Sequence, residues 1–338
     1  MMDPKDIGRI AITAEELGLS ADVSLDESAA ALLRQQRQTW PTLRENFDAL
    51  ARVQVRELVV EGLPVRIQFN PGRLTSSAAN VDAQAVRERK CFLCLPHLPP
   101  VQRGIPYGPS FVLLGNPFPI FPEHFTIPHV DHVPQRFAGE IGTFLGLARD
   151  LAPRYAVFYN GPRCGASAPD HLHFQAGTRH FMPLEGQYAR LRAEHGHLVQ
   201  RTGVATVHAI EGRGRRFIAV EGADARDVEQ AVASCVERLQ QSADGDEEAM
   251  MNIIAWYDAP GWTVLVFPRA KHRPSFYFAE GEERLLISPA AVDLGGVSIT
   301  PLEADFHKVT PEHLSTMLRE ILMPADAFAH LFPPASHR

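Results

Sequence analysis

The sequence predicts an α+β protein built from two related halves, each an antiparallel sheet flanked by helices, with a helical extension at the N-terminus. Three observations support this fold class. Residues 111–177 have the pattern of two strands, a helix, a strand, a loop and a further strand. Residues 204–270 repeat a similar order. The 27 prolines and 24 glycines favour short strands and loops over long helical bundles.

The N-terminal segments change from a helical to a strand pattern near residue 53. Apolar residues recur at three- and four-residue spacing in residues 28–50, and Pro41 splits this stretch into two predicted helices. Residues 53–70 then alternate as in a β-hairpin that turns near Glu61 and Gly62. A polar loop with a short helix and a turn with two cysteines follow, in residues 70–90 and 91–100.

The two repeated units come after this turn. The first has predicted strands at 111–120, 124–133, 155–161 and 170–177, and an amphipathic helix at 137–153. The second has predicted strands at 204–212, 215–222, 250–258 and 261–270, and a helix at 224–241. We therefore divide the chain into an extension with the first strands (1–60), a catalytic half (61–195) and a second half (196–325).

Composition and charge argue against several protein classes. Apolar residues make up 45% and charged residues 22% of the chain, as in a packed globular protein. No run of about 18 apolar residues predicts a membrane span, and the N-terminus lacks the pattern of a signal peptide. Four cysteines without an export signal favour a reducing compartment, which predicts a cytoplasmic location. The net charge of −7 argues against a general nucleic-acid-binding surface.

The segment from His171 to Gln175 carries the strongest chemical signal. On a strand, residues two apart share a face, so His171, His173 and Gln175 are predicted to project together while Leu172 and Phe174 enter a core. The alternative is a surface strand with incidental polar residues. A glycine-containing loop directly upstream (161–169) and the apolar partners favour a site instead.

Such a site suits transfer of a phosphoryl-linked group. A neutral imidazole is a good nucleophile near pH 7, and its attack on an α-phosphorus gives an energy-rich phosphoimidazole. Gln175 can donate an N–H to a phosphoryl oxygen but cannot protonate a leaving group, which favours reversible transfer over hydrolysis. Ser167 and the backbone N–H groups of Gly165 to Ser167 are candidate phosphate donors.

These segments resemble the histidine-triad superfamily. The resemblance rests on residues 115–133 (GNPFPIFPEHFTIPHVDHV), the following helix and the string HLHFQ, and covers roughly residues 91–300. Hydrolase members end the motif with a third histidine, whereas the transferase branch ends it with glutamine, as here at Gln175. That branch includes galactose-1-phosphate uridylyltransferase, diadenosine tetraphosphate phosphorylase and the GDP-hexose phosphorylases. Residues 251–273 and the pair Gly295-Gly296 are similar to the C-terminal half of the diadenosine tetraphosphate enzymes.

The resemblance implies specific roles. The middle histidine of the motif is the nucleophile, which is His173, and the glutamine that steadies the nucleotidyl group is Gln175. His171 completes the predicted catalytic group. The loop serine corresponds to Ser167, in a loop one residue longer than in the family, and the asparagine that cradles the ligand corresponds to Asn160. Asp170 departs from several relatives, and one option is that it orients a histidine.

Cys91 and Cys94 have the spacing of a zinc knuckle, although two ligands alone are a weak signal. The resemblance to uridylyltransferases adds a histidine after the second strand and the first histidine of the motif. The implied structural zinc site is therefore Cys91, Cys94, His132 and His171, and the chemistry itself requires no metal. The alternative is two small buried residues at a turn, with His97 as a rival ligand.

Other polar residues are candidate substrate contacts, each with a plainer alternative. Arg73, in the turn Asn70–Ser77, could hold a sugar or terminal phosphate, or lie in a solvated loop. Asn116 could shape the base and ribose pocket rather than take part in the chemistry. Arg163 could neutralise phosphate or face solvent. Arg269 and Lys271 could reach a second phosphate, or form a charged strand end.

The predicted function is nucleotidyl transfer through a covalent nucleotidyl-histidine. A nucleoside-diphosphate sugar or dinucleoside polyphosphate would be the donor, and phosphate or a phosphate ester the acceptor. A related hydrolase, a non-catalytic nucleotide-binding protein and a zinc-stabilised interaction module are the alternatives. The base, the sugar and the direction of the reaction stay open. Several relatives are dimers, so a homodimer is one option for the oligomeric state.

Overall fold

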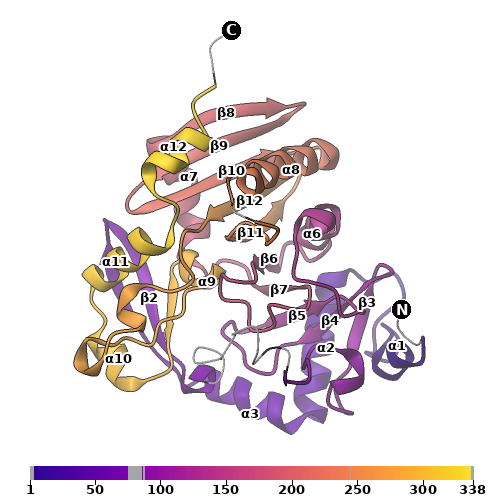
Figure 1. Cartoon of the computed structure of the whole chain (residues 1–338). Coiled ribbons are helices and arrows are strands. Elements are labelled where there is room, and N and C mark those ends of the chain that lie inside the picture. The colour runs from indigo at the N-terminus through magenta and orange to yellow at the C-terminus, as the bar shows by residue number, and fades with distance from the viewer. Residues whose placement is uncertain (1–3, 75–85, 87, 244, 336–338) are drawn as a thin grey trace.

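The structure, a computed structural model of the chain, describes residues 4–74, 86, 88–243 and 245–335, with side chains from Ile7 onward. One sheet of ten strands runs through the molecule in the order β3-β4-β5-β7-β6-β11-β12-β10-β9-β8 (Figure 1). In that order the strands are Gly104–Tyr107, Phe111–Gly115, His124–Pro128, His173–Thr178, Tyr155–Asn160, Met251–Asp258, Gly261–Pro268, Arg215–Gly222, Ala205–Gly212 and Gly196–Thr202. Each neighbouring pair in this sheet is antiparallel.

The strands of the two repeated units meet where β6 pairs with β11, and Asn160 is the register partner of Asn252. The five strands on one side of this junction come from residues 104–178, and the five on the other side from residues 196–268. The α+β class with antiparallel sheets and N-terminal helices is therefore confirmed. The division at residues 60 and 195 stays a prediction.

Helices cover both faces of the large sheet. One face packs against α2 (Leu25–Thr39), α3 (Pro41–Leu50), α6 (Ile141–Asp150) and α8 (Ala225–Ser242), and α6 lies beside α8 (Figure 1). The other face packs against α7 (Pro183–His195), α9 (Ala291–Leu294), α10 (Glu303–Lys308) and α11 (Pro311–Ile321). Among the described residues, the further helices are α1 (Pro4–Ile10), α12 (Ala325–Leu331) and the short 3-10 turns η1 (Pro71–Arg73), η2 (Leu95–His97), η3 (Ala138–Glu140), η4 (Ser275–Tyr277) and η5 (Gly281–Glu283).

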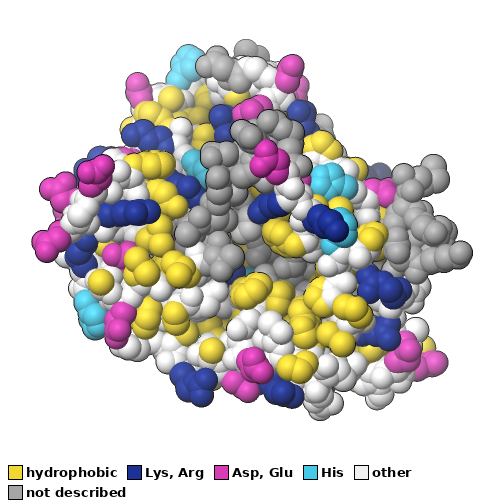
Figure 2. All heavy atoms as spheres, turned by 60° about the horizontal axis from the view of Figure 1, so that its bottom comes forward, with side chains coloured by type: hydrophobic (Ala, Val, Ile, Leu, Met, Phe, Trp, Pro, Cys, Tyr) yellow, Lys and Arg dark blue, Asp and Glu magenta, His cyan; other side chains and the backbone are white. Residues whose placement is uncertain are grey.

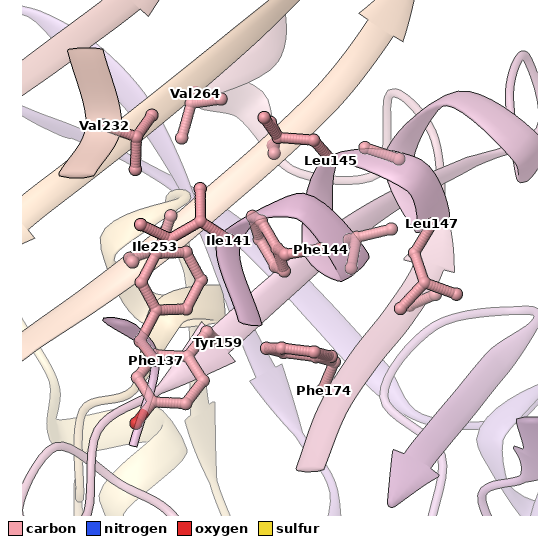
Figure 3. Packing of buried hydrophobic residues seen from close by; sticks show 14 of the residues in the cluster. Phe137, Ile141, Phe144, Leu145, Leu147, Tyr159, Phe174, Val232, Ile253 and Val264 are labelled. Atoms are coloured by element: carbon pink, nitrogen blue, oxygen red, sulfur yellow. The ribbon is translucent and has the colours of Figure 1, made fainter. Parts of the chain in front are cut away.

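Phe174 anchors the strand that carries the histidine motif. Its side chain is fully buried in the core under α6, with ring centroids 5.2 Å from Phe144 and 5.4 Å from Phe111. Figure 3 shows Phe174 facing Phe144, with Phe137 and Tyr159 beside it. Because side chains alternate along a strand, this packing turns His173 and Gln175 to the opposite face.

A second, smaller sheet joins distant parts of the chain. Its order is β1-β2-β13, formed by Gln54–Val60, Leu63–Phe69 and Val297–Thr300. The first two strands form the predicted hairpin, and its turn places Glu61 and Gly62 at φ values of 50° and 80°. The third strand pairs in parallel with β2. The split of the N-terminal helices at Pro41 is also confirmed, because α2 ends at Thr39 and α3 begins at Pro41.

The surface carries charges of both signs. On the face in Figure 2, Lys and Arg side chains are interspersed with Asp and Glu, and hydrophobic side chains lie between them. Within the described residues, no helix is long and apolar enough to cross a membrane.

Candidate active site

The histidine motif begins two residues before β7, and this separates its two histidines. β7 starts at His173, so His171 lies in the segment ahead of the strand. The imidazole of His171 contacts a cysteine, with Nδ1 at 3.2 Å from the Cys91 sulfur. The expectation that three polar side chains project together from a strand therefore needs correction. His173 and Gln175 share the strand face, and His171 reaches the thiols.

His173 is held in one tautomer by the chain itself. Its Nδ1 lies 2.8 Å from the carbonyl oxygen of His171, which can only accept, so Nδ1 carries the proton. The lone pair of the neutral ring is consequently on Nε2. Burial lowers the pKa of His173 to about 4, while the bond to the His171 carbonyl opposes this shift. The ring is therefore neutral at pH 7 with a nucleophilic Nε2.

Gln135 fixes the start of β7 and had no signal in the sequence. Its Oε1 accepts from the N–H of His173 at 2.8 Å, and its Nε2 donates to the carbonyl oxygens of Asn160 at 2.9 Å and His173 at 3.2 Å. The side chain is buried. Gln135 thus ties the end of β6 to the start of β7 next to His173.

His124 orients the amide of Gln175. The N–H of Ile120 donates to Nδ1 of His124 at 3.2 Å, so Nε2 of the neutral ring carries the proton. That Nε2 lies 3.1 Å from Oε1 of Gln175 and donates to it. Burial, followed by the positive charge of Arg73, lowers the pKa of His124 to about 3. With Oε1 of Gln175 engaged, its NH₂ group is directed away from His124 as a donor.

Arg73 and Asn116 lie on the same side of this group. Nη1 of Arg73 donates to the carbonyl of Phe118 at 2.9 Å, and its charge acts on His124. Nδ2 of Asn116 donates to Oγ1 of Thr126 at 2.9 Å, and Thr126 is the register partner of Gln175. The structure thus brings Arg73 and Asn116 close to the strands of the motif. Residues 75–77 of the predicted phosphate turn lie outside the described residues.

Asn160 belongs to a buried chain of amides. Its Oδ1 accepts from Nδ2 of Asn252 and from the N–H of Ala291, both at 2.8 Å. Asn252 in turn accepts from Nη1 of Arg269 at 2.6 Å. The other Arg269 nitrogen, Nη2, donates to the carbonyls of Lys271 and His272 at 2.9 and 2.8 Å. These hydrogen bonds of Arg269 are therefore made to other groups of the protein. Asn252 was not among the residues predicted from the sequence.

The loop before the motif packs tightly at Gly165. This residue has a φ of 92°, and an added Cβ would lie 2.6 Å from Cβ of Ala290. Glycine is required on both grounds. The carbonyl of Ser167 accepts from Nη2 of Arg89 at 2.6 Å, which fixes the loop at its other end.

Arg163 and Lys271 line the same cavity at the surface, and each has an acidic partner. Arg163 lies 3.3 Å from a carboxylate oxygen of Glu247, and Lys271 lies 3.7 Å from Glu320.

The four predicted metal ligands are brought together. The ligand atoms of Cys91, Cys94, His132 and His171 all lie within 4.8 Å of one another. Nδ1 of His132 is 3.3 Å from the Cys94 sulfur, and Nδ1 of His171 faces both sulfurs, at 3.2 and 3.7 Å. Two thiols and two imidazoles in this arrangement fit a tetrahedral zinc ion.

The outer contacts of these histidines fit a metal as well. Nε2 of His171 donates to the carbonyl of His129 at 2.8 Å, which leaves Nδ1 as the lone-pair nitrogen. Nε2 of His132 lies 3.3 Å from a carboxylate oxygen of Asp170, the residue for which one option was orienting a histidine. His97 instead hydrogen-bonds the carbonyl of Cys91, at 2.7 Å, and is not in the cluster.

Comparison with known proteins identifies a matching family and solved structures with a similar fold. Residues 32–178 match a family described as a domain of unknown function (DUF4922). A crystal structure of yeast Ap4A phosphorylase Apa2 in complex with AMP has a TM-score of 0.52 at 18% identity, over 87% of this chain and 97% of that one. Another structure of the same enzyme gives 0.51 at 16% identity, over 84% and 94%. The chain has the histidine-triad-like fold of this phosphorylase.

The other comparisons gave a weaker structural similarity and no sequence match. A GalT-like protein from Arabidopsis thaliana aligns with a TM-score of 0.40 at 13% identity, over 80% of this chain and 99% of that one. No curated protein sequence matches the chain. The histidine-triad-like fold predicted from the HLHFQ motif is thus confirmed by the phosphorylase structures.

Proposed function

We propose that the protein is a nucleotidyltransferase of the phosphorylase type, with His173 as the nucleophile. The donor is a dinucleoside polyphosphate or a nucleoside-diphosphate sugar, and the acceptor is phosphate or a phosphate ester. The observation that carries the proposal is the pair of fixed tautomers. His173 presents a lone pair on Nε2, and His124 leaves the amide N–H groups of Gln175 as donors on the same strand face.

The reaction has two steps that balance without an added proton donor. Nε2 of His173 attacks the α-phosphorus, the P–N bond forms, and the P–O bond to the leaving phosphate group breaks. The leaving group departs as an anion, so Gln175 need not protonate it. The imidazole then carries a positive charge, which the His171 carbonyl stabilises at Nδ1. An oxygen of the acceptor attacks the same phosphorus, the P–N bond breaks, and His173 returns to its neutral form.

The comparisons support the substrate class. The fold neighbour is a phosphorylase of Ap4A, and it has been seen with AMP. Gly165 and Ser167 in the loop, Asn160 behind it, and Arg73 and Asn116 beside Gln175 are proposed to surround the nucleotide. The position of Arg73 near the buried His124 supports a phosphate contact.

The zinc site is proposed to be structural. Cys91, Cys94, His132 and His171 would hold the ion, which would supply no step of the chemistry. It would fix His171, and thereby the carbonyl that orients His173. A homodimer and a cytoplasmic location stay predictions.

Intact-protein mass spectrometry tests the proposal. The protein is mixed, without an acceptor, with GDP-, UDP- and ADP-sugars and with Ap4A in turn. We expect one nucleoside monophosphate to be added, discharged by phosphate or a sugar phosphate and absent in His173→Ala. His330→Ala, an exposed histidine on α12, is the matched control and should form the adduct.

Two results would contradict the proposal. Loss of the adduct to water as fast as to phosphate would identify a hydrolase. Absence of any adduct from folded protein that binds nucleotide would identify a non-catalytic binding protein.

A further inference from the structure

A cavity of about 350 Å³ opens at the surface. Three segments form it: the loop after β6, the residue before β11 and the chain that follows β12. The lining residues are Arg163, Met250, Ala270, Lys271, His272, Arg273 and Phe278. A volume of this size lies in the range of small-molecule sites.

The wall of the cavity is positively charged. Of the described residues that line it, three are Lys or Arg and none is Asp or Glu. Glu247 and Glu320 each contact one of these cations from outside the lining. His272 also lines the cavity. Its pKa is lowered to about 4, first by burial and then by Arg273, Arg269 and Arg163.

The side chain of Arg273 and the backbone at Lys271 and His272 are held by surrounding structure. The guanidinium of Arg273 lies 4.2 Å from the ring centroid of Tyr277, and its Nε donates to Oγ of Ser288 at 3.0 Å. The backbone at Lys271 and His272 is fixed by Nη2 of the buried Arg269. A preorganised cation such as Arg273 loses little freedom when it binds an anion.

An aromatic ring stands at the same cavity. Phe278 is 68% exposed, and its ring packs edge-on against Tyr277 with centroids 5.1 Å apart. The exposed ring of Phe278 offers a face for stacking with a base.

Among the described residues, those that line the cavity include none of the histidine motif, residues 171–175. Lys271 follows β12, which is the third strand from β7 in the sheet order. Neighbouring strands lie about 4.8 Å apart, so the two strands are separated by roughly 14 Å.

We propose that this cavity is a second binding site, which takes a nucleoside polyphosphate. The phosphates lie against Arg163, Lys271 and Arg273, and the base stacks on Phe278. Arg and Lys are the side chains that bind phosphate oxygens, and stacking accepts any base. The site goes beyond the proposed transfer reaction, because it does not include His173 or Gln175.

Calorimetric titration of the full chain tests the site. ATP is added to His173→Ala protein at moderate salt, and we expect one class of binding sites to be the proposed cavity. Adding Lys271→Glu should weaken the ATP affinity of this class at least about tenfold, as loss of one charged phosphate contact does. Phe278→Ala should weaken the same class about fivefold or more. Arg190→Glu reverses an exposed cation on α7 outside the cavity and should leave the affinity unchanged. Thermal unfolding checks that each variant is folded.

The outcomes separate this proposal from the transferase. If the His173→Ala protein binds ATP equally well with and without Lys271→Glu or Phe278→Ala, the proposal of a second site is overturned. Tripolyphosphate binding as tightly as ATP, with no effect of Phe278→Ala, would overturn its nucleoside part. The transferase proposal is tested independently. It fails if the wild-type protein forms no adduct on His173.

Discussion

The carbonyl oxygen of His171 lies 2.8 Å from Nδ1 of His173, and the imidazole of the same His171 lies 3.2 Å from the sulfur of Cys91. One residue therefore connects the cysteine cluster to the proposed nucleophile. Its side chain belongs to the cluster, and its backbone sets the tautomer of the ring two positions on. The predicted zinc site and the predicted chemistry are coupled through two adjacent peptide units.

Removal of the zinc should slow nucleotidyl transfer, although the proposed zinc site is structural and takes no part in the chemistry. We expect about one zinc ion per chain by atomic emission, and its loss in Cys94→Ser. The adduct should then form more slowly, because the zinc no longer holds Nδ1 of His171. Asp170→Asn should retain zinc with about 10- to 100-fold lower affinity, since it alters only the outer contact of His132. Normal adduct formation in zinc-free, folded protein would show that the coupling is absent.

His124 should act as a positioning residue. His124→Ala frees the carbonyl of Gln175, so its amide can turn, and we expect kcat to fall by about 100-fold, as for loss of one oriented donor. His124→Gln keeps a donor at the position of Nε2 and should restore most of the rate. The measurement is single-turnover adduct formation, with KM for the donor determined separately. A change in KM alone would point to a purely structural role.

The pH dependence of stability should also contain a contribution from His124. Its folded pKa of about 3 lies below the usual value near 6.5, so the unfolded chain binds the proton first as the pH falls. The associated stability is present above pH 6.5 and is lost between about pH 6.5 and 3. One proton corresponds to a slope of about 1.4 kcal/mol per pH unit. Denaturant unfolding from pH 7 to 5 should show a shallower slope in His124→Gln than in wild type, and equal slopes would contradict this assignment.

Phe174 should be a major contributor to the stability of the catalytic strand. Its ring is fully buried against Phe111 and Phe144, so Phe174→Ala removes a large packed side chain. We expect a loss of about 3–5 kcal/mol in the free energy of unfolding. Phe174→Leu should cost less and retain adduct formation. Val204→Ala, at an exposed position between β8 and β9, is a control that should leave stability within about 0.5 kcal/mol.

Repeating patterns made much of the fold predictable. The alternation in residues 53–70 and in the strands around Phe174 identified β1, β2, β6 and β7, and the helical spacing before Pro41 identified α2 and α3. The strand β13 left no such signal, because it has four residues and pairs with a strand far away in the sequence. The start of β7 was also misjudged, since alternation continues through His171 although the ladder begins at His173.

The candidate site was predictable where chemistry follows from adjacent residues. Cys91, Cys94, His132 and His171 were implied by the family resemblance, and the structure assembles them. Gln135, His124 and Asn252 could not be predicted in the same way. Each is a single polar residue without a spacing pattern, and each acquires its role only because the sheet places β5, β6, β7 and β11 side by side.

The pairing of β2 with β13 has a consequence for biosynthesis. The two strands join residues such as Gln68 and Thr300, which are 232 positions apart. A nascent chain emerging from the ribosome has its hairpin of β1 and β2 long before the third strand exists, so one edge of that hairpin stays open during most of translation. Exposed edges invite pairing with other chains, and the late strand closes this one. This edge can therefore be covered only after residues 297–300 have left the exit tunnel.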